Sequence, residues 1–318
     1  MALYLTEQDI QSLLTFPDAI SLVEKAFEAR ARGRALDIPR ERTRMPGGHL
    51  HILQAAALDL NAVGYKAYYI QPERSRTSLL TLIDREEGNV IGMLESDILG
   101  QIRTGAATAV AIKHLARPDA KVLGLFGTGR HAVTQLQAAC QALRFERVKV
   151  FGRDKERLTA FCQKMEQQVG TIVQPATSRE DTVKGSDVII TMTRASEPLF
   201  EGSWLEPGQF IAATGANALN RREIDTETVK RCGIVVVDSR DVARKESGDL
   251  LPAYEDGLLY WENTPELGEI IIGQRPGRTQ AEQIILFESH GMAVQDIYTG
   301  MHVLSLARSR GMGRELPM

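Results

Sequence analysis

The sequence predicts an α/β protein with two domains. Its 318 residues are enough for two domains of ordinary size, each with its own core. Between residues 121 and 238, short β-branched runs alternate with helical patterns, whereas the first part of the chain has a helical pattern followed by consecutive strand patterns. Alternating strands and helices are typical of a parallel sheet, and consecutive strands of an α+β unit.

The first part of the chain predicts helices and then strands. Thr6 and Asp9 have the spacing of a capping box, and the helical spacing over residues 18–32 ends at Gly33. A further helix is expected over residues 96–117, where Pro118 ends it. Four strands are expected between these helices, and a turn at residues 85–89 joins the last two: 50–58, 63–70, 79–83 and 90–94.

The middle of the chain predicts a separate parallel-sheet domain. Its strands are expected over 121–126, 147–151, 187–192, 209–214 and 233–238. We place this domain at residues 117–288. A last helical pattern, over residues 292–310, returns to the first domain, which then comprises residues 1–116 and 289–318.

Composition excludes several classes of protein. Hydrophobic residues are 43% and charged residues 25%, which does not fit a disordered chain, and no apolar run reaches the roughly 20 residues of a membrane span. A net charge of -3 without a basic tail disfavours nucleic acid as a partner. The three cysteines lack CxxC spacing and the N-terminus lacks a signal-peptide pattern, so we expect a cytoplasmic protein.

A glycine-rich turn follows the first strand of the middle domain. Gly127, Gly129 and Ala132 match the G-x-G-x-x-G/A pattern between a strand and a helix. The first glycine permits the tight turn, the second lets backbone N–H groups approach a pyrophosphate, and the third small residue lets helix and strand pack closely. The positive end of the helix favours the phosphates. The turn predicts a Rossmann dinucleotide-binding domain.

The end of the second strand bears on the choice of nucleotide. An acidic residue there binds the ribose hydroxyls of NAD, but this chain has Gly152 and Arg153, with Lys155 and Arg157 nearby. Arginine suits a 2′-phosphate, so NADP(H) is favoured over NAD(H). Asp154 favours NAD instead, and the charges could also be a solvated helix start.

Short recognisable stretches follow one another over nearly the whole chain: RTRMP (42–46), GYK (64–66), RTGAATAVAIKHLA (103–116), GTGRHA (127–132), RREID (221–225), KESGD (245–249), LGEIIIG (267–273) and FESHGMAVQD (287–296). Through these stretches the chain resembles the ornithine cyclodeaminase/mu-crystallin family. Each is short, but their order and spacing together are specific.

The resemblance implies a homodimer in which the N-terminal domains form a shared barrel and bind the substrate. Arg42, Lys66 and Arg103 align with the cationic cluster that holds a substrate carboxylate beside the nicotinamide. Guanidinium groups bind planar carboxylates through two hydrogen bonds. For each residue the alternative is a surface charge or a structural ion pair.

The resemblance also implies the residues that bind the cofactor. They are Ser75 and Arg76 on the nicotinamide side; Gly127, Thr128, Gly129, Arg130 and His131 at the pyrophosphate; Gly152, Arg153, Asp154 and Arg157 at the adenosine end; and Thr193, Arg194, Thr214 and Ser289 around the nicotinamide ribose and ring. His131 stands where the family often has glutamine, so we expect a phosphate-side donor or a helix-surface residue there.

One position separates two chemistries within the family. Cyclodeaminases have an aspartate in a turn where this chain has Gly215, Ala216 and Asn217. Because an amide cannot act as a carboxylate base, cyclodeamination is in doubt. Mu-crystallin-like reductases also lack that aspartate. Asp225 is a separate acid, expected at a helix start or a domain contact.

These observations favour an NAD(P)H-dependent reductase of a small cyclic α-imino acid, such as Δ1-pyrroline-2-carboxylate or Δ1-piperideine-2-carboxylate. Lys66 and Arg103 are expected to be catalytic, with Glu246 as the candidate to hold the proton and Asp249 as a weaker one. No metal is expected. The alternatives are an alanine-dehydrogenase-like enzyme, an ornithine cyclodeaminase, and a non-catalytic NADP(H)-linked ligand-binding protein.

Overall fold

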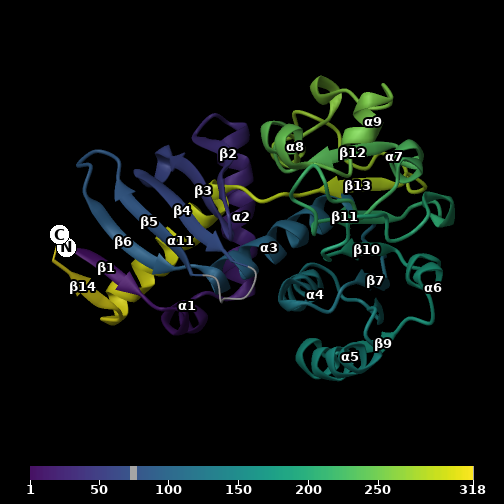
Figure 1. The fold of residues 1–318 in the computed structure, drawn as a ribbon, viewed down its shortest axis with the longest axis horizontal. Helices are drawn as coiled ribbons and strands as arrows, with labels where there is room; N and C mark the ends of the chain where they lie inside the picture. The colour runs from purple at the N-terminus through teal and green to yellow at the C-terminus, as the bar shows by residue number, and fades with distance from the viewer. Residues whose placement is uncertain (72–76, 318) are drawn as a thin grey trace. The chain divides into compact units, whose positions relative to one another are not determined.

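The protein divides into two compact units. A computed structural model describes residues 1–71 and 77–317. Unit 1 consists of Met1–Arg103 and Gly291–Met318, and unit 2 of Thr104–His290 (Figure 1). The first division lies inside helix α3 (Asp97–Leu115), so this helix contributes residues to both units.

Unit 1 is built on a seven-stranded sheet of order β14-β1-β6-β5-β4-β3-β2. Neighbouring strands are antiparallel except β1 and β6, which are parallel. The strands are β1 (Ala2–Leu5), β2 (Ala35–Met45), β3 (Gly48–Ala57), β4 (Ala62–Ile70), β5 (Ser78–Asp84), β6 (Val90–Glu95) and β14 (Arg314–Leu316). A short 3-10 turn (Leu58–Leu60) joins β3 to β4.

Helices cover one face of this sheet. Helix α11 (Ala293–Arg310) packs on β2 to β5 and on α2 (Phe16–Ala31), while α1 (Glu7–Leu13) contacts α11 and β6 (Figure 1). Thr6 and Asp9 form the predicted capping box of α1. The predicted return of the last helix to the first part of the chain is how α11 lies in the structure.

Unit 2 is a parallel α/β unit, as the sequence predicts. Its seven strands have the order β12-β13-β11-β10-β7-β8-β9. They are β7 (Val122–Phe126), β8 (Arg147–Phe151), β9 (Ile172–Pro175), β10 (Val188–Thr191), β11 (Phe210–Ala213), β12 (Ile234–Val237) and β13 (Ile285–Glu288). The helices are α4 (Arg130–Ala142), α5 (Lys155–Val169), α6 (Arg179–Val183), α7 (Thr226–Arg231), α8 (Arg240–Glu246), α9 (Leu251–Glu255) and α10 (Leu267–Ile271), with 3-10 turns at Gly202–Trp204 and Trp261–Asn263.

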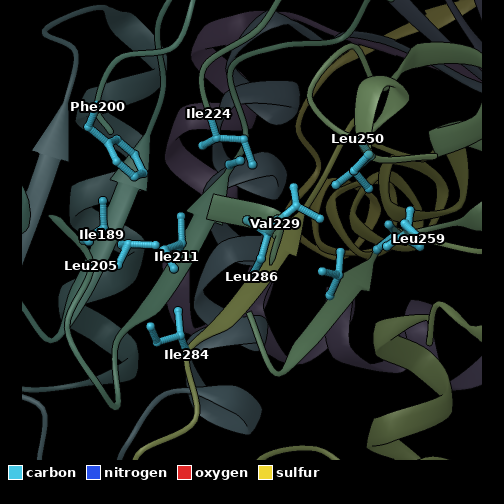
Figure 2. Close-up of a cluster of buried hydrophobic side chains, with 14 of the residues drawn as sticks. Ile189, Phe200, Leu205, Ile211, Ile224, Val229, Leu250, Leu259, Ile284 and Leu286 are labelled. Atoms are coloured by element: carbon cyan, nitrogen blue, oxygen red, sulfur yellow. The ribbon is translucent and has the colours of Figure 1, made fainter. Parts of the chain in front are cut away.

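An apolar core packs between the parallel strands of unit 2 and the helices that follow them. Figure 2 shows part of it, with side chains from β10, β11, β13 and α7 close to one another. Ile189, Ile211 and Leu286 are fully buried in these strands. This core fixes the carboxyl ends of the strands, where ligands of open α/β sheets bind.

Candidate active site

Unit 1 holds a buried cluster of opposite charges. Lys66 on β4 lies with its Nζ 2.5 Å from Oδ1 of Asp296, and Arg103 on α3 donates from Nε to the same oxygen at 3.1 Å. The three side chains are at most 6% exposed. The structure therefore brings together two of the three cations predicted from the sequence. They surround Asp296, which was not among the predicted site residues.

The backbone explains why these side chains meet. Lys66 pairs with Leu53 and Leu80 in the sheet register, both fully buried, so its side chain belongs to the face that α11 covers. Arg103 also donates from Nη1 to Gln295 at 3.0 Å. Gly291 has φ +83°, and a Cβ there would lie 2.6 Å from Nη1 of Arg103. The guanidinium thus needs glycine at that position.

The charges shift the pKa values of this cluster. Burial lowers the pKa of Lys66 to about 7; the Asp296 carboxylate opposes this, and Arg103 adds to it. Burial raises the pKa of Asp296, but Arg103 and Lys66 outweigh it and leave that pKa below its ordinary value. The positive charge of Arg40, which is also buried, lowers the pKa of Lys66 further. These contacts are the structural ion pair that the sequence leaves open as the alternative for Lys66 and Arg103. While Lys66 is protonated, two cations share one carboxylate, and the excess positive charge favours an anionic ligand.

Arg42 lies on the same face of the sheet as Lys66. In the register Arg42 pairs with His51, and His51 pairs with Tyr68, two residues beyond Lys66. The rings of His51 and Tyr68 stack with centroids 4.6 Å apart, and both side chains are buried. His51 and Tyr68 were missed from the sequence because their alternation with apolar neighbours is typical of an ordinary strand.

In unit 2 the glycine-rich turn joins β7 to α4. Gly127 has φ +119°, and a Cβ there would lie 2.3 Å from the carbonyl oxygen of Met192, so the fold itself requires this glycine. Gly129 is the N-cap of α4, and a Cβ there would meet nothing within 4 Å. The space beside Gly129 is open to a ligand, and the first N–H groups of α4 are available to bind an anion.

The other residues predicted at the pyrophosphate lie beside this turn. Thr128 is half-buried, and its methyl group would be 3.0 Å from a Cβ at Gly152, the residue that follows β8. Arg130 is exposed and His131 half-buried in the first turn of α4.

The residues predicted at the adenosine end lie in the turn after β8 and in the first turn of α5. Asp154 caps α5, because its Oδ1 accepts a hydrogen bond of 3.0 Å from the backbone N of Arg157. Arg153 and Arg157 are exposed. Within the described part of the chain, neither guanidinium makes a hydrogen bond or ion pair. Asp154 therefore has a structural role, while two guanidinium groups are available at this end.

The residues predicted around the nicotinamide come from the ends of neighbouring strands. Thr193 follows β10, Thr214 follows β11 and Ser289 follows β13, and these strands are adjacent in the sheet. Thr214 donates to the carbonyl oxygen of Thr191 at 3.0 Å, and Ser289 donates to Asp238 at 2.8 Å. Arg194 is exposed. Ser75 and Arg76, also predicted here, lie outside the described residues.

The predicted proton-holding residues belong to unit 2. Glu246 ends α8 and is fully buried. Asp249 accepts hydrogen bonds from the backbone N of Glu223 and Ile224, at 2.6 and 2.9 Å, and is hydrogen-bonded to Glu288. Burial, together with Asp249, raises the pKa of Glu288 well above its ordinary value.

Two further residues that the sequence predicts to be informative, Asp225 and Asn217, lie in the segment between β11 and α7. Asp225 caps α7 by accepting from the backbone N of Thr228 at 2.7 Å, which confirms the predicted helix start. Asn217 is half-buried, four residues after β11.

Comparison with known proteins agrees with this arrangement. The model of the ornithine cyclodeaminase/mu-crystallin family matches residues 2–310. The chain belongs to this family. It is 33% identical over 272 residues to a Δ1-pyrroline-2-carboxylate reductase of Bacillus cereus, covering 83% of each protein. It is 28% identical to the alanine dehydrogenase of Archaeoglobus fulgidus, covering 99% of this chain and 98% of that protein.

A solved structure shows the same fold. The Δ1-pyrroline-2-carboxylate reductase of Thermococcus litoralis, in complex with NADH and L-proline, matches with a TM-score of 0.94 and 30% identity over 99% of this chain and 100% of that chain. Membership in this family and the similarity to these reductases show that the chain is an NAD(P)-dependent oxidoreductase that acts on CH–NH or C=N bonds.

The described residues contain neither a membrane-spanning helix nor a cluster of metal-binding side chains. No helix among residues 1–71 and 77–317 is both long and apolar enough to cross a lipid bilayer. The same residues contain no group of three or more His, Cys, Asp or Glu side chains arranged to bind a metal ion.

Proposed function

We propose that this protein reduces a small cyclic α-imino acid, such as Δ1-pyrroline-2-carboxylate or Δ1-piperideine-2-carboxylate, with NAD(P)H. The observation that carries the proposal is the buried cluster of Lys66, Arg103 and Asp296, two cations on one carboxylate. Together with Arg42 on the same face, it can bind the carboxylate of an imino acid. The relatives that reduce such an imine support the same assignment.

The chemistry divides between binding and proton transfer. When bound, NAD(P)H would supply the hydride for the carbon of the C=N bond; with a proton taken up at the nitrogen, the imino acid would become the cyclic amino acid. Holding the carboxylate fixes which face of the C=N bond is exposed, and positioning accounts for most of the rate enhancement of such a step. Lys66, with its pKa of about 7, can carry a proton at neutral pH. Glu246 remains our candidate to supply the proton that the imine nitrogen takes up.

We assign NADP(H) as the preferred nucleotide. Arg153 and Arg157 are exposed at the adenosine end with no ion-pair partner in the described part of the chain, and Asp154 is engaged as a helix cap. Guanidinium groups are suited to a 2′-phosphate. NAD(H) is the alternative, because two related structures contain NADH or NAD.

We also propose a homodimer formed through the outer face of the sheet in unit 1. Leu36, Ile38, Ile52 and Tyr65 are 37–59% exposed, and strand alternation and register place them on the face opposite to α11. An exposed apolar sheet face of this kind is typical of an interface. Analytical ultracentrifugation of the wild type and of an Ile52→Lys, Tyr65→Lys variant tests this proposal. The wild type should sediment as a dimer and the variant as a monomer, and a wild-type monomer would contradict the proposal.

A cofactor-oxidation assay tests the proposed reaction. Purified protein with NADPH or NADH and either imino acid should oxidise the cofactor, measured at 340 nm. Arg42→Ala should reduce kcat/KM for the imino acid by about 100-fold or more, because one carboxylate ligand is lost, and change the Kd of the nucleotide by less than about twofold. Equal losses of both would show that Arg42 is structural. Cofactor left unoxidised with any imino acid contradicts the proposal.

A second function is an alanine-dehydrogenase-like reaction. The similarity to the Archaeoglobus enzyme over 99% of this chain favours it. The same carboxylate site and hydride transfer serve a keto acid that condenses with ammonia. Oxidation of NAD(P)H by pyruvate and ammonia, at a kcat/KM above that for the cyclic imines, would favour this function. Proline and ammonia released from ornithine with NAD+ would instead favour a cyclodeaminase despite Asn217, and cofactor binding without any turnover a ligand-binding protein.

A further inference from the structure

Glu223 is a buried carboxylate that holds two strand ends together. It lies between β11 and α7, in the stretch RREID, with no exposed surface. Its Oε1 accepts from the backbone N and the Oγ1 of Thr193, both at 2.6 Å. Its Oε2 accepts from Oγ1 of Thr191 and the backbone N of Gly215, both at 2.8 Å. One carboxylate therefore links the end of β10 to the end of β11.

Close packing supports the same role. A Cβ at Gly215 would lie 2.5 Å from Oε1 of Glu223 and 2.5 Å from the backbone N of Thr193, so the backbone after β11 rests directly on the carboxylate. Behind it, the backbone N of Glu223 donates to Asp249 at 2.6 Å, and its carbonyl oxygen accepts from Leu199 at 2.8 Å. Glu223 is thus held on both sides.

A carboxylate is a costly residue at such a position. Burial raises the pKa of Glu223 to about 7; the Thr193 hydrogen bonds oppose this, and the nearby Asp249 adds to it. An apolar side chain of similar volume could fill this space at lower free-energy cost, but it could not gather N–H and O–H donors from two loops.

We propose that Glu223 is a positioning residue for the nicotinamide end of the cofactor. Its carboxylate sets the Thr193 loop and the Gly215 loop in the arrangement that the dinucleotide binds. This inference rests on the proposed function, because that function needs a bound nicotinamide, and the family resemblance implies that Thr193 and Thr214 lie around it. Glu223 itself does not need to touch the nucleotide, since it acts through the backbone of the residues that do.

The test measures nucleotide binding without any imino acid. In Glu223→Gln, an NH2 group replaces one acceptor and faces donors, so the Kd of NADPH and NADH, from fluorescence titration, should rise by about tenfold. Thr191→Val removes a single donor from a fully buried strand residue and should raise the same Kd by about threefold. KM for the imino acid should change by less than about twofold in both variants, because the carboxylate ligands of unit 1 are unaltered.

Asp225→Asn is the matched control. Asp225 lies two residues from Glu223 and also accepts backbone and hydroxyl hydrogen bonds, but its donors are Gly202 and Thr228. It should lower the unfolding midpoint and leave the nucleotide Kd within about twofold. Equal effects of Glu223→Gln and Asp225→Asn on Kd would overturn the proposal, as would an unchanged Kd in Thr191→Val. The second criterion decides alone where Glu223→Gln does not fold.

The outcomes separate this proposal from the proposed function. Wild-type protein that binds the nucleotides but reduces no imino acid contradicts only the proposed reaction, and the Kd comparison still decides the role of Glu223. Wild-type protein that binds neither nucleotide overturns both.

Discussion

The candidate anion-binding sites of the two units are built from different chemical groups. In unit 1 the candidate carboxylate site consists of charged side chains, Lys66 and Arg103, already paired with Asp296. In unit 2 the candidate phosphate site consists of backbone, with Gly127 and Gly129 at the start of α4. The first depends on the ionisation of side chains and the second on the shape of a turn, so the two should respond differently to substitution and to pH.

The largest expected effect comes from the turn of unit 2. In Gly127→Ala, the new Cβ would lie 2.3 Å from the carbonyl oxygen of Met192 at a φ of +119°, so we expect loss of folded protein, a cost of several kcal/mol. Gly129→Ala, with nothing within 4 Å, should fold normally but bind the nucleotide about 100-fold more weakly. Circular dichroism and fluorescence titration measure the two. Equal behaviour of both variants contradicts the separation of turn and ligand roles.

The next effect comes from the glycine beside Arg103. In Gly291→Ala the new Cβ would lie 2.6 Å from Nη1 of Arg103, so the guanidinium must move and kcat/KM for the imino acid should fall by about 100-fold. Gly311→Ala is the control. Gly291 lies just before α11 and Gly311 just after it, and Gly311 also has positive φ, but a Cβ there would meet nothing within 4 Å. The control should cost about 1 kcal/mol of stability with unchanged kcat/KM. A similar loss of activity in both variants would show a general effect on α11.

A smaller, pH-dependent effect follows from Lys66. Its pKa of about 7 means that the unliganded site loses a positive charge as the pH rises through neutrality. The Kd of pyrrole-2-carboxylate, a planar analogue with no titrating nitrogen in this range, should rise by about tenfold per pH unit above that value. Lys66→Met should bind weakly and without this dependence. A pH-independent wild-type Kd between pH 6 and 9 contradicts the assignment.

The stability linkage of Lys66 has the opposite sign. Its folded pKa of about 7 lies below the ordinary 10.5, so between these values the unfolded chain binds more protons. The contribution of Lys66 to the free energy of unfolding should therefore increase with pH across this range. Differential denaturation of wild type and Lys66→Met measures it.

The smallest expected effect is at the adenosine end. Arg153→Ala should raise the Kd of NADPH by about tenfold and that of NADH by less than about twofold, because we assign its exposed guanidinium to the 2′-phosphate, which NADH lacks. Titration with both nucleotides measures the ratio. A parallel loss of both affinities would assign Arg153 to another part of the nucleotide.

Most of the fold could be predicted because local patterns and tertiary structure agree. The strands of unit 2 that match the prediction, such as β11 (Phe210–Ala213), are buried apolar runs. Strand β2, with Pro39 and several charged residues, did not read as a strand; it forms because it pairs along one side with β3 at the sheet edge. Strand β13 was also missed, since only long-range pairing places its four residues between β11 and β12.

The candidate site was predictable only in part. The cations of unit 1 stood out from apolar surroundings, but Asp296 was overlooked within a helical pattern, although an acid amid apolar residues was a usable signal. Glu223 lies in a stretch that carries the family resemblance, but no role was expected for it from the sequence. Its role depends on hydrogen bonds between segments far apart in the chain, which spacing does not reveal.

The split composition of unit 1 has a consequence for biosynthesis. Asp296 belongs to α11, which the ribosome makes after all of unit 2, whereas Lys66 and Arg103 are made early. Until α11 emerges, the first strands have neither their covering helix nor the counter-ion for two cations that are buried in the finished protein. We therefore expect unit 2 to fold first during translation and unit 1 to complete only after α11 has been made.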